Sequence, residues 1–301
     1  MIKKIKRILH YKFMKLWCAN NPKKWAGFVF QYKFGRPLNW DAPKDLNEKI
    51  NWLKFNRDTT LWTELSDKYR MKKYVEERGF GQYIPKLYGQ WDRAEDVNWD
   101  SLPNQFVMKV NNGSGDVIIC KDKSHFDCKA AKEQMKKLLK TKFGNKMAEP
   151  HYNRIRPCIF AEEYLDPQLQ NEKSNCLTDY KIWVFNGKPA FIMACTDRTP
   201  EMLYLSLYDL EWHFLPQYLI NTRHLTSRTT PIAKPKCLDM MLRIASELSF
   251  NEPQVRVDFY EVGGKPYLGE LTFTAFAGFI DYYSQEFLDM LGDLCNIDNS
   301  L

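Results

Sequence analysis

Two strand-like runs near the C-terminal end constrain the fold more than any other part of this 301-residue chain. They read VRVDFY and PYLGELTF and are joined by EVGGK. Apolar residues occupy alternate positions, a period of two that is typical of strands with one buried face; these are Val255, Val257, Phe259, Tyr267, Leu271 and Phe273. The pattern therefore predicts an antiparallel hairpin whose opposite face carries Arg256, Asp258, Glu270 and Thr272.

The register of this hairpin decides whether its two acidic residues meet. A two-residue turn at Gly263 and Gly264 would pair Asp258 with Gly269 and turn Glu270 to the other face, so an odd loop or a glycine bulge is needed. Gly263 and Gly264 favour such a bulge, because glycine adopts positive φ at little cost. Cross-strand neighbours have Cβ atoms about 5 Å apart. Asp258 and Glu270 in such positions would bind one cation jointly. Magnesium fits this geometry, because it takes oxygen ligands at about 2.1 Å. The alternative is a charged face that is merely solvated.

The charge is unevenly distributed along the chain. Residues 1–40 contain ten Lys or Arg and no Asp or Glu, whereas the remaining 261 residues contain 34 basic and 37 acidic residues. A nucleic-acid binder usually spreads its basic residues over the recognition surface, so this distribution argues against nucleic acid as a partner. It favours a local contact of the N-terminal arm with a membrane surface or a polyanion.

The arm itself predicts a short basic amphipathic helix, since Ile2, Ile5, Leu9, Phe13 and Leu16 recur at helical spacing among lysines. Residues 1–16 are either an interfacial membrane anchor or a helix that docks on the body. No apolar signal region and no run of about 18 apolar residues is present. Because the eight cysteines form no close pair either, we expect a cytoplasmic protein, which the anchor alternative would make peripheral at the inner face of the cell membrane.

The rest of the chain alternates helices and strands. A helix over DKYRMKKYVEERG ends at Gly79, a strand QFVMKV leads through NNGSGD into VIICKD, and residues 127–142 form a lysine-rich helix. A second hairpin turns at Asn186 and Gly187, and LDMMLRIASELSF is an amphipathic helix that leads into the C-terminal hairpin. The fold class is therefore α+β with mostly antiparallel strands.

Several charged residues stand where strands end. Lys109 closes an apolar run just before the small-residue loop Asn112-Gly113-Ser114-Gly115, a position from which an ammonium and backbone amides reach a polyphosphate. A hairpin turn with a solvated lysine is the alternative. Lys181 and Arg198 belong to the second hairpin and would offset triphosphate charge in the same cleft. Glu162 and Glu163 follow another apolar run, where they either contact an adenine or ribose edge or simply enter solvent.

These motifs, in this order, resemble an ATP-grasp enzyme, in particular the TupA-like family tied to teichuronopeptide and other surface-polysaccharide loci. The resemblance is carried by DK before a helix, FVMKVNNGSG, AEEYL, DYKIWVFNGKP with TDR, and RVDFY with YLGELTF. LNEKINWLKF and LSDKYRMKKYV look like the lead-in of that family, so the resemblance covers roughly residues 38–292.

The resemblance implies an ATP-grasp fold, in which two α+β subdomains with antiparallel sheets clasp ATP. We expect a basic, aromatic helical segment over residues 1–65 and the ATP-grasp domain over 66–301, divided into an ATP-clasping subdomain at about 100–163 and a metal-binding subdomain at about 164–301. Residues 1–65 are too short for the full N-terminal α/β domain of ligases in the wider superfamily.

The resemblance also assigns roles to residues. It implies that ATP lies near Lys68, Lys109 and the loop Asn112–Gly115, with adenine contacts at Glu162, Glu163, Tyr164 and Leu165 and ribose contacts at Asp179. Lys181 and Arg198 would face phosphate or an acyl phosphate, Arg256 would steady the reacting phosphoryl group, and Asp258 and Glu270 would bind Mg²⁺. The third metal-site position, usually asparagine, is Thr272 here, and a hydroxyl is a poorer ligand.

The resulting interpretation is an ATP- and Mg²⁺-dependent carboxylate–amine ligase that forms an amide through an acyl phosphate in surface-polysaccharide biosynthesis. Its substrates would be a small-molecule or polysaccharide-linked carboxylate, such as a uronic acid or acidic peptide, and an amine. Two alternatives stay open. One is a glycosyltransferase of capsule or lipopolysaccharide assembly, although no DxD occurs; the other is a non-catalytic nucleotide-binding protein that kept the fold.

Overall fold

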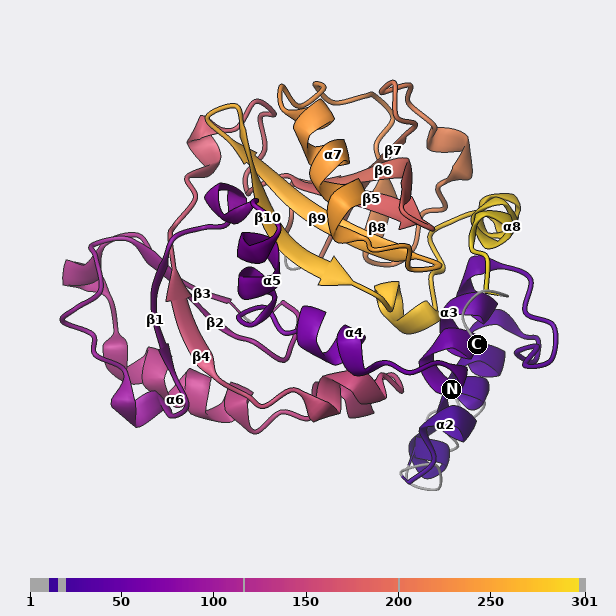
Figure 1. Ribbon diagram of the computed structural model, residues 1–301, viewed down its shortest axis with the longest axis horizontal. Coiled ribbons are helices and arrows are strands. Elements are labelled where there is room, and N and C mark those ends of the chain that lie inside the picture. Colours follow the sequence, from indigo (N-terminus) through magenta and orange to yellow (C-terminus); the bar gives the residue numbers. More distant parts are fainter. Residues whose placement is uncertain (1–10, 16–19, 116, 200, 298–301) are drawn as a thin grey trace.

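Two β-sheets face each other in the computed structural model, which describes residues 11–15, 20–115, 117–199 and 201–297 (Figure 1). The smaller sheet has the strand order β1-β4-β2-β3 and the larger one the order β10-β9-β5-β6-β7-β8. All pairs are antiparallel except β7 with β8. The sequence prediction of an α+β fold with mostly antiparallel strands is confirmed.

The four-stranded sheet contains β1 (Leu87–Trp91), β2 (Phe106–Val110), β3 (Val117–Cys120) and β4 (Ile159–Glu162). The six-stranded sheet contains β5 (Asp179–Phe185), β6 (Lys188–Thr196), β7 (Leu203–Tyr208), β8 (Leu225–Ser227), β9 (Val255–Val262) and β10 (Lys265–Thr272). The chain passes from the first sheet to the second after Glu162, at the segment that contains Glu163, Tyr164 and Leu165.

The described helices are α2 (Pro22–Phe34), α3 (Leu46–Asn56), α4 (Thr60–Leu65), α5 (Met71–Glu77), α6 (Cys128–Leu139), α7 (Leu238–Leu248) and α8 (Gln285–Leu294). α6 packs on the small sheet and α7 on the large one. Although α3 and α4 precede residue 66, their apolar side chains belong to the same hydrophobic core as the large sheet. No described helix has the length and hydrophobicity that a bilayer span requires.

The C-terminal hairpin has the face predicted from its sequence but reaches it by a different route. Val262 pairs with Lys265 across a two-residue turn in which both glycines have positive φ, 61° and 73°. The register shifts between Leu268 and Glu270, so that Glu270 lies opposite Asp258. The predicted bulge therefore exists, but its place in the turn was wrong, because the extra residue is Gly269.

This bulge also changes which side chains are buried. Leu268, and not Tyr267, joins Phe259 in the core, since the extra residue reverses the alternation before it. The charged face is enclosed rather than solvated, because Asp258 is only 2% exposed. Both the burial of Tyr267 and the idea of a solvent-facing acidic pair were wrong.

The segment that follows β10 contains a left-handed turn. Phe276, Ala277 and Gly278 have φ of 47°, 56° and 73° in succession, a conformation that costs energy for residues with a side chain. Helix α3 holds this turn in place: Asn51 donates to the Gly278 carbonyl at 2.7 Å and Lys54 to the Ala277 carbonyl at 2.8 Å. The N-terminal helices thus fix the chain just beyond the last strand of the large sheet.

The predicted N-terminal helix falls mostly outside the described residues. Of residues 1–16, the structure describes 11–15. They are helical. Tyr11 packs edge-on against Trp25 of α2 at 5.2 Å between ring centroids, whereas Phe13 of the predicted apolar stripe is 57% exposed. The choice between docking on the body and anchoring in a membrane stays a prediction for the residues before 11.

Candidate nucleotide site between the two sheets

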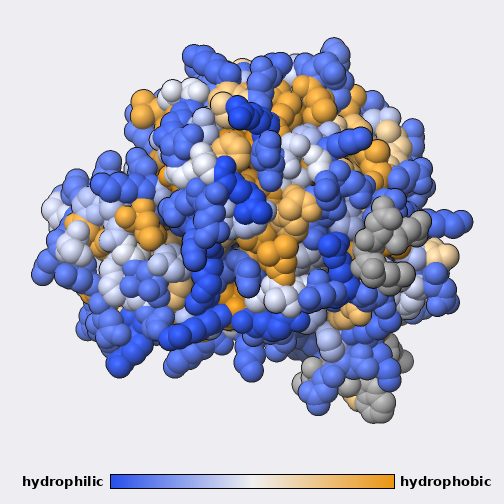
Figure 2. Space-filling view, viewed as in Figure 1, coloured by the Kyte–Doolittle hydropathy of each residue, from blue (hydrophilic) through white to orange (hydrophobic). Residues whose placement is uncertain are grey.

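A cleft of about 540 Å³ lies between the two sheets. It is lined by most of the candidate site residues, namely Lys68, Lys109, Gly113, Ser114, Gly115, Glu162, Glu163, Tyr164, Leu165, Asp179, Lys181, Arg198, Arg256, Asp258 and Glu270. Figure 2 shows hydrophobic side chains gathered in the middle of the same view, where the two sheets meet, within a mainly hydrophilic surface. Residues spread over more than 200 positions of sequence therefore converge on one cavity.

The large sheet contributes a dense cluster of charges to this cleft. Asp258 accepts two hydrogen bonds from the Arg256 guanidinium at 2.7 and 2.8 Å and one from Lys181 at 2.6 Å. Lys181 also lies 3.3 Å from Asp179, which accepts from Arg198 at 3.1 Å. Three strands, β5, β9 and β10, place these groups side by side, because Lys181 and Glu270 both pair with Asp258 in the register.

Glu270 completes the cluster from β10. Its carboxylate pairs with Lys68, lies 3.5 Å from Arg256 and retains 26% of its side-chain exposure. Burial alone would raise the pKa of Glu270, but Lys68, Lys181 and Arg256 outweigh it and hold this pKa well below its usual range. The group is therefore a carboxylate at any physiological pH.

The cations of this cluster stay charged for the same reason. Burial would lower the pKa of Lys181, yet Asp179 and Asp258 raise it above its ordinary value. Burial likewise opposes the charge on Arg256, and Asp258 and Glu270 outweigh that effect. The site thus presents fixed positive and negative charges in a largely desolvated space, where electrostatic interactions are stronger than in water.

The small sheet contributes a second ionic group on the opposite wall. Glu162, at the end of β4, accepts from Lys72 at 2.8 Å and pairs with Lys109 through its other oxygen. Burial would raise the pKa of Glu162, but the ammonium groups of Lys109 and Lys72 lower it to about 2. From the sequence we expected the Glu162 carboxylate to contact an adenine or ribose, whereas in the structure it binds two lysines. Lys72 was missed because it lies on α5, 90 residues earlier.

Two candidate residues do not line the cleft. The Asn112 side chain is 5% exposed and donates to the Thr141 carbonyl at 3.4 Å. The Thr272 hydroxyl accepts from Arg256 at 3.3 Å and donates to Glu270 at 3.2 Å. Thr272 is therefore placed to orient the Glu270 carboxylate, and its role as a direct metal ligand stays a prediction.

The apolar walls of the cleft were not recognised in the sequence. Val107, Val117 and Ile119 come from the small sheet, and Met193, Leu203, Leu205 and Leu268 come from the large one. Val117 and Ile119 are 42% and 51% exposed, which is unusual for such residues on a strand. Their alternation with Ile118 and Cys120 was the only sequence signal. An apolar slot beside a cationic cluster is suited to a planar base with a phosphate tail.

A model of the TupA-like ATP-grasp family matches residues 48–296. The chain belongs to this family. Its ATP-grasp fold, with two sheets clasping a cleft, is the one expected from the order of the sequence motifs, so that resemblance is confirmed. The match begins within α3, which agrees with the packing of α3 into the core of the large sheet.

Solved ATP-grasp structures align with this chain at low identity. The D-alanine–D-alanine ligase of Bacillus anthracis gives a TM-score of 0.42 at 17% identity, covering 84% of this chain and 69% of that one. The corresponding ligase of Helicobacter pylori gives 0.44 at 13%, covering 86% and 67%. D-Cycloserine synthetase DcsG gives 0.40 at 14%, covering 78% and 70%. No curated protein matches the chain. The family membership therefore rests on the family model.

The ligands available in this ATP-grasp cleft fit a hard divalent cation. Asp258 and Glu270 are neighbours in the register and both face the cleft, and carboxylate oxygens are the ligands that Mg²⁺ prefers. Both are now paired with cations, which a triphosphate would draw toward its own oxygens. The four cations Lys68, Lys181, Arg198 and Arg256 outnumber the three carboxylates of the cluster, which leaves positive charge for the phosphates.

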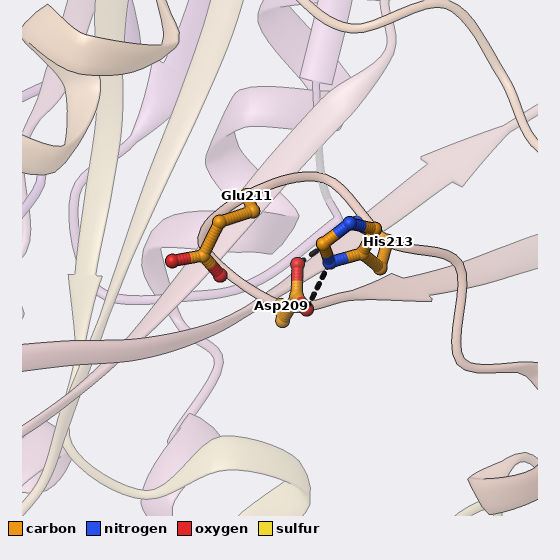
Figure 3. A group of neighbouring side chains, drawn as sticks. All are labelled: Asp209, Glu211 and His213. Carbon is orange, nitrogen blue, oxygen red and sulfur yellow. Dashed lines mark hydrogen bonds and ion pairs between the residues drawn. The ribbon is translucent and has the colours of Figure 1, made fainter.

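A second group of ligand-type side chains lies on the turn after β7. Asp209, Glu211 and His213 have ligand atoms within 4.8 Å of one another (Figure 3). Asp209 accepts from the His213 backbone at 2.8 Å and bonds its Nδ1 at 2.7 Å, while the Glu211 carboxylate lies to one side of this pair. These bonds stabilise the turn. They account for the approach of Asp209 to His213.

Proposed function

We propose that this ATP-grasp protein is an ATP- and Mg²⁺-dependent ligase that joins a carboxylate to an amine. The observation that carries the proposal is the pairing of Asp258 with Glu270 on one wall of the cleft, surrounded by Lys68, Lys181 and Arg256. Phosphoryl transfer depends mainly on positioning and on neutralising charge. This cluster supplies both requirements from strands of a rigid sheet.

The reaction proceeds in two displacements. An oxygen of the substrate carboxylate attacks the γ-phosphorus of ATP, the bond to the bridging oxygen breaks, and ADP leaves. The product is an acyl phosphate. The amine nitrogen then attacks the acyl carbon, the carbon–oxygen bond breaks, and inorganic phosphate leaves while the nitrogen gives up a proton. No step needs a nucleophilic side chain of the protein.

The residues of the chain take distinct parts in this sequence. The apolar slot receives the adenine, and Asp179 lies where a ribose would follow. Lys109, held by Glu162, and the loop from Gly113 to Gly115 receive the phosphates. Arg256 and Lys181 lie against Asp258 and face the transferred phosphoryl group. When bound at Asp258 and Glu270, Mg²⁺ would neutralise charge on the phosphate oxygens.

The substrate class and setting extend the proposal further. We place the reaction in the biosynthesis of a surface polysaccharide of teichuronopeptide type, with a uronic acid or acidic peptide as the carboxylate and an amino acid or amino sugar as the amine. The acceptor is a small molecule or is linked to the polysaccharide, and the reaction occurs in the cytoplasm. The resemblance to the TupA-like family supports this setting.

Release of ADP with a panel of carboxylates and amines tests the proposal. We expect ADP to form from ATP and Mg²⁺ only when a uronic acid or acidic peptide and an amine are both present, and the amide to appear by mass spectrometry. ATP–Mg²⁺ should also raise the melting temperature, whereas nucleotide sugars should not. A melting shift with ATP but no ADP release with any mixture favours the non-catalytic nucleotide-binding alternative. A shift with nucleotide sugars instead favours the glycosyltransferase.

A further inference from the structure

A second concentration of positive charge lies far from the N-terminal arm in sequence. Residues 121–146 contain nine lysines against three acidic residues and no arginine. Removing this stretch and residues 1–40 from the 44 basic and 37 acidic residues of the chain leaves 25 basic against 34 acidic in the other 235 residues. The excess of basic over acidic residues is therefore confined to two segments, and the rest of the protein has a net negative charge.

Helix α6 carries the centre of the second segment. Its buried residues are Ala131 and Met135, and Met135 packs into the small core that contains Phe106 and Met108. Lys129, Lys137 and Lys140 are exposed on the opposite side of the helix, and the half-buried Lys132 lies between the two sides. Because Val107 and Lys109 on the alternate positions of β2 line the cleft, the lysines of α6 point away from the nucleotide site.

The fold joins this helix to the first basic segment. The chain after α6 runs along the lower edge of the molecule toward α2 (Figure 1), where the Trp25 indole donates to the Lys146 carbonyl at 3.2 Å. Ala148 packs in the same small cluster as Trp25 and Ala26. The lysines of these connected elements are called here the basic face: Lys23, Lys24, Lys129, Lys132, Lys137, Lys140, Lys142 and Lys146.

The lysines of the basic face have no carboxylate partner within ion-pair distance among the described residues, whereas the neighbouring Lys136 is paired with Glu95 and Glu133. None of them lines the nucleotide cleft. Unpaired lysines on an exposed surface attract anionic lipid headgroups, and each contributes a roughly fivefold factor to partitioning near such a surface. A cluster made of lysines alone acts by charge, without the forked hydrogen bonds that arginine gives to individual phosphates.

We propose that the basic face docks the protein on an anionic lipid surface. In the sequence, α2 is preceded by residues 1–16, where apolar residues recur at helical spacing among lysines, a composition that favours the surface of an anionic membrane. The acidic remainder of the protein is repelled from the same surface, which orients the molecule with the basic face toward the lipid. The proposal does not depend on the reaction assigned to the cleft.

Partitioning of the full chain onto vesicles tests the proposal. Co-sedimentation of the protein is measured with phosphatidylcholine vesicles, with and without about 30% phosphatidylglycerol. This anionic lipid gives the vesicles a strong negative surface potential. The test variant changes Lys129, Lys132, Lys137 and Lys140 to Glu. The matched control changes Lys188, Arg223, Lys234 and Arg243 to Glu, which are exposed residues away from the basic face. Both variants alter the net charge equally.

We expect the wild-type protein to bind only the anionic vesicles, more weakly as salt is raised. The test variant should bind at least about a hundredfold less tightly, and the control should bind nearly as tightly as wild type. Equal losses in both variants would show that net charge, not this face, is responsible, and overturn the proposal. Failure of the wild type to bind would do the same, as would preferential binding to soluble poly-glutamate. The melting temperature of each variant, and its increase with ATP, verify that the variant folds. If the Lys→Glu test variant does not fold, a variant with the same four lysines changed to Gln takes its place.

Discussion

Glu162 and Glu270 lie on opposite walls of the same cleft and are held differently. The Glu162 side chain is 6% exposed, and both of its carboxylate oxygens bind lysines from two other elements. The Glu270 side chain keeps 26% of its exposure and meets Lys68 at the edge of the cavity. One carboxylate is enclosed by its partners, and the other is open to a ligand.

The comparison assigns different roles to two carboxylates of the same cleft: Glu162 positions other residues, and Glu270 is open to a ligand. A buried carboxylate with two ammonium partners fixes where those partners stand, here Lys109 at the start of the glycine loop. A carboxylate at the cavity edge can exchange its cation for a metal ion or a phosphate-bound cation. The pKa of both groups lies below the ordinary value, so the titration behaviour alone does not distinguish the two roles.

We expect the largest effect on activity from removing the charge of the open carboxylate, Glu270. Changing Glu270→Gln should lower ADP formation by about 10²–10³-fold, the usual cost of removing one preorganised charge from a transition state, and should leave the melting temperature within a few degrees of wild type. Asp258→Asn should lose activity to a similar degree but also stability, because it leaves Arg256 and Lys181 buried with too little negative charge. Turnover and thermal unfolding, measured on both variants, check this difference. Wild-type turnover in Glu270→Gln would refute the role of the open carboxylate.

Breaking the enclosed carboxylate should act mainly on stability. Glu162→Gln leaves Lys72 and Lys109 without a full counter-charge, and we expect a loss of about 3 kcal/mol in the free energy of unfolding and a severalfold rise in the KM for ATP. The neighbouring Glu163→Gln is the matched control for stability, because in the described part of the chain its carboxylate accepts from the Lys86 backbone at 3.2 Å and holds no lysine. Urea unfolding of both variants measures stability, and ATP titration of Glu162→Gln measures KM. Equal losses of stability in the two variants would remove the distinction.

Acid should weaken the fold through the enclosed carboxylate. The pKa of Glu162 is about 2 in the folded protein against 4.5 ordinarily, so its stabilising contribution is present above pH 4.5 and is lost as pH falls toward 2. Burial lowers the pKa of His151 to about 3, so stability also declines as pH falls from 6.5. We expect the melting temperature to fall in two stages. His151→Phe should flatten the decline between pH 6.5 and 4.5 and make the decline from pH 4.5 to about 3 less steep.

The smallest effect tests the bulge that brings Glu270 into register. A Cβ added at Gly269 would lie 3.3 Å from the Asp258 carbonyl and 3.3 Å from the Tyr260 ring, so Gly269→Ala requires a shift of a few tenths of an ångström. We expect a severalfold higher Mg²⁺ requirement with a small loss of stability. Gly27→Ala in α2, where a Cβ would meet Trp40 only at 3.8 Å, is the control. An unchanged Mg²⁺ dependence in Gly269→Ala would show that the exact place of the bulge is unimportant.

Prediction from the sequence succeeded where the relevant contacts are local or run along one hairpin. The period-two alternation placed Asp258 and Glu270 on one face, and the Asn186-Gly187 turn was found because both residues have positive φ, 48° and 81°. It failed at Tyr267, since a single extra residue at Gly269 reverses the faces before it. It also failed for Lys72, because nothing in a helix sequence shows that its ammonium will meet a carboxylate 90 residues later.

The sequence by itself determined the α+β class, the order of motifs along the chain and the polar face of the C-terminal hairpin, because backbone periodicity and turn chemistry act over a few residues. Only the tertiary structure decided which carboxylate is enclosed, which is open, and that the chain after α6 packs against α2. Those outcomes depend on the packing of distant elements, and a side chain's neighbours in space determine its burial and its charge partners.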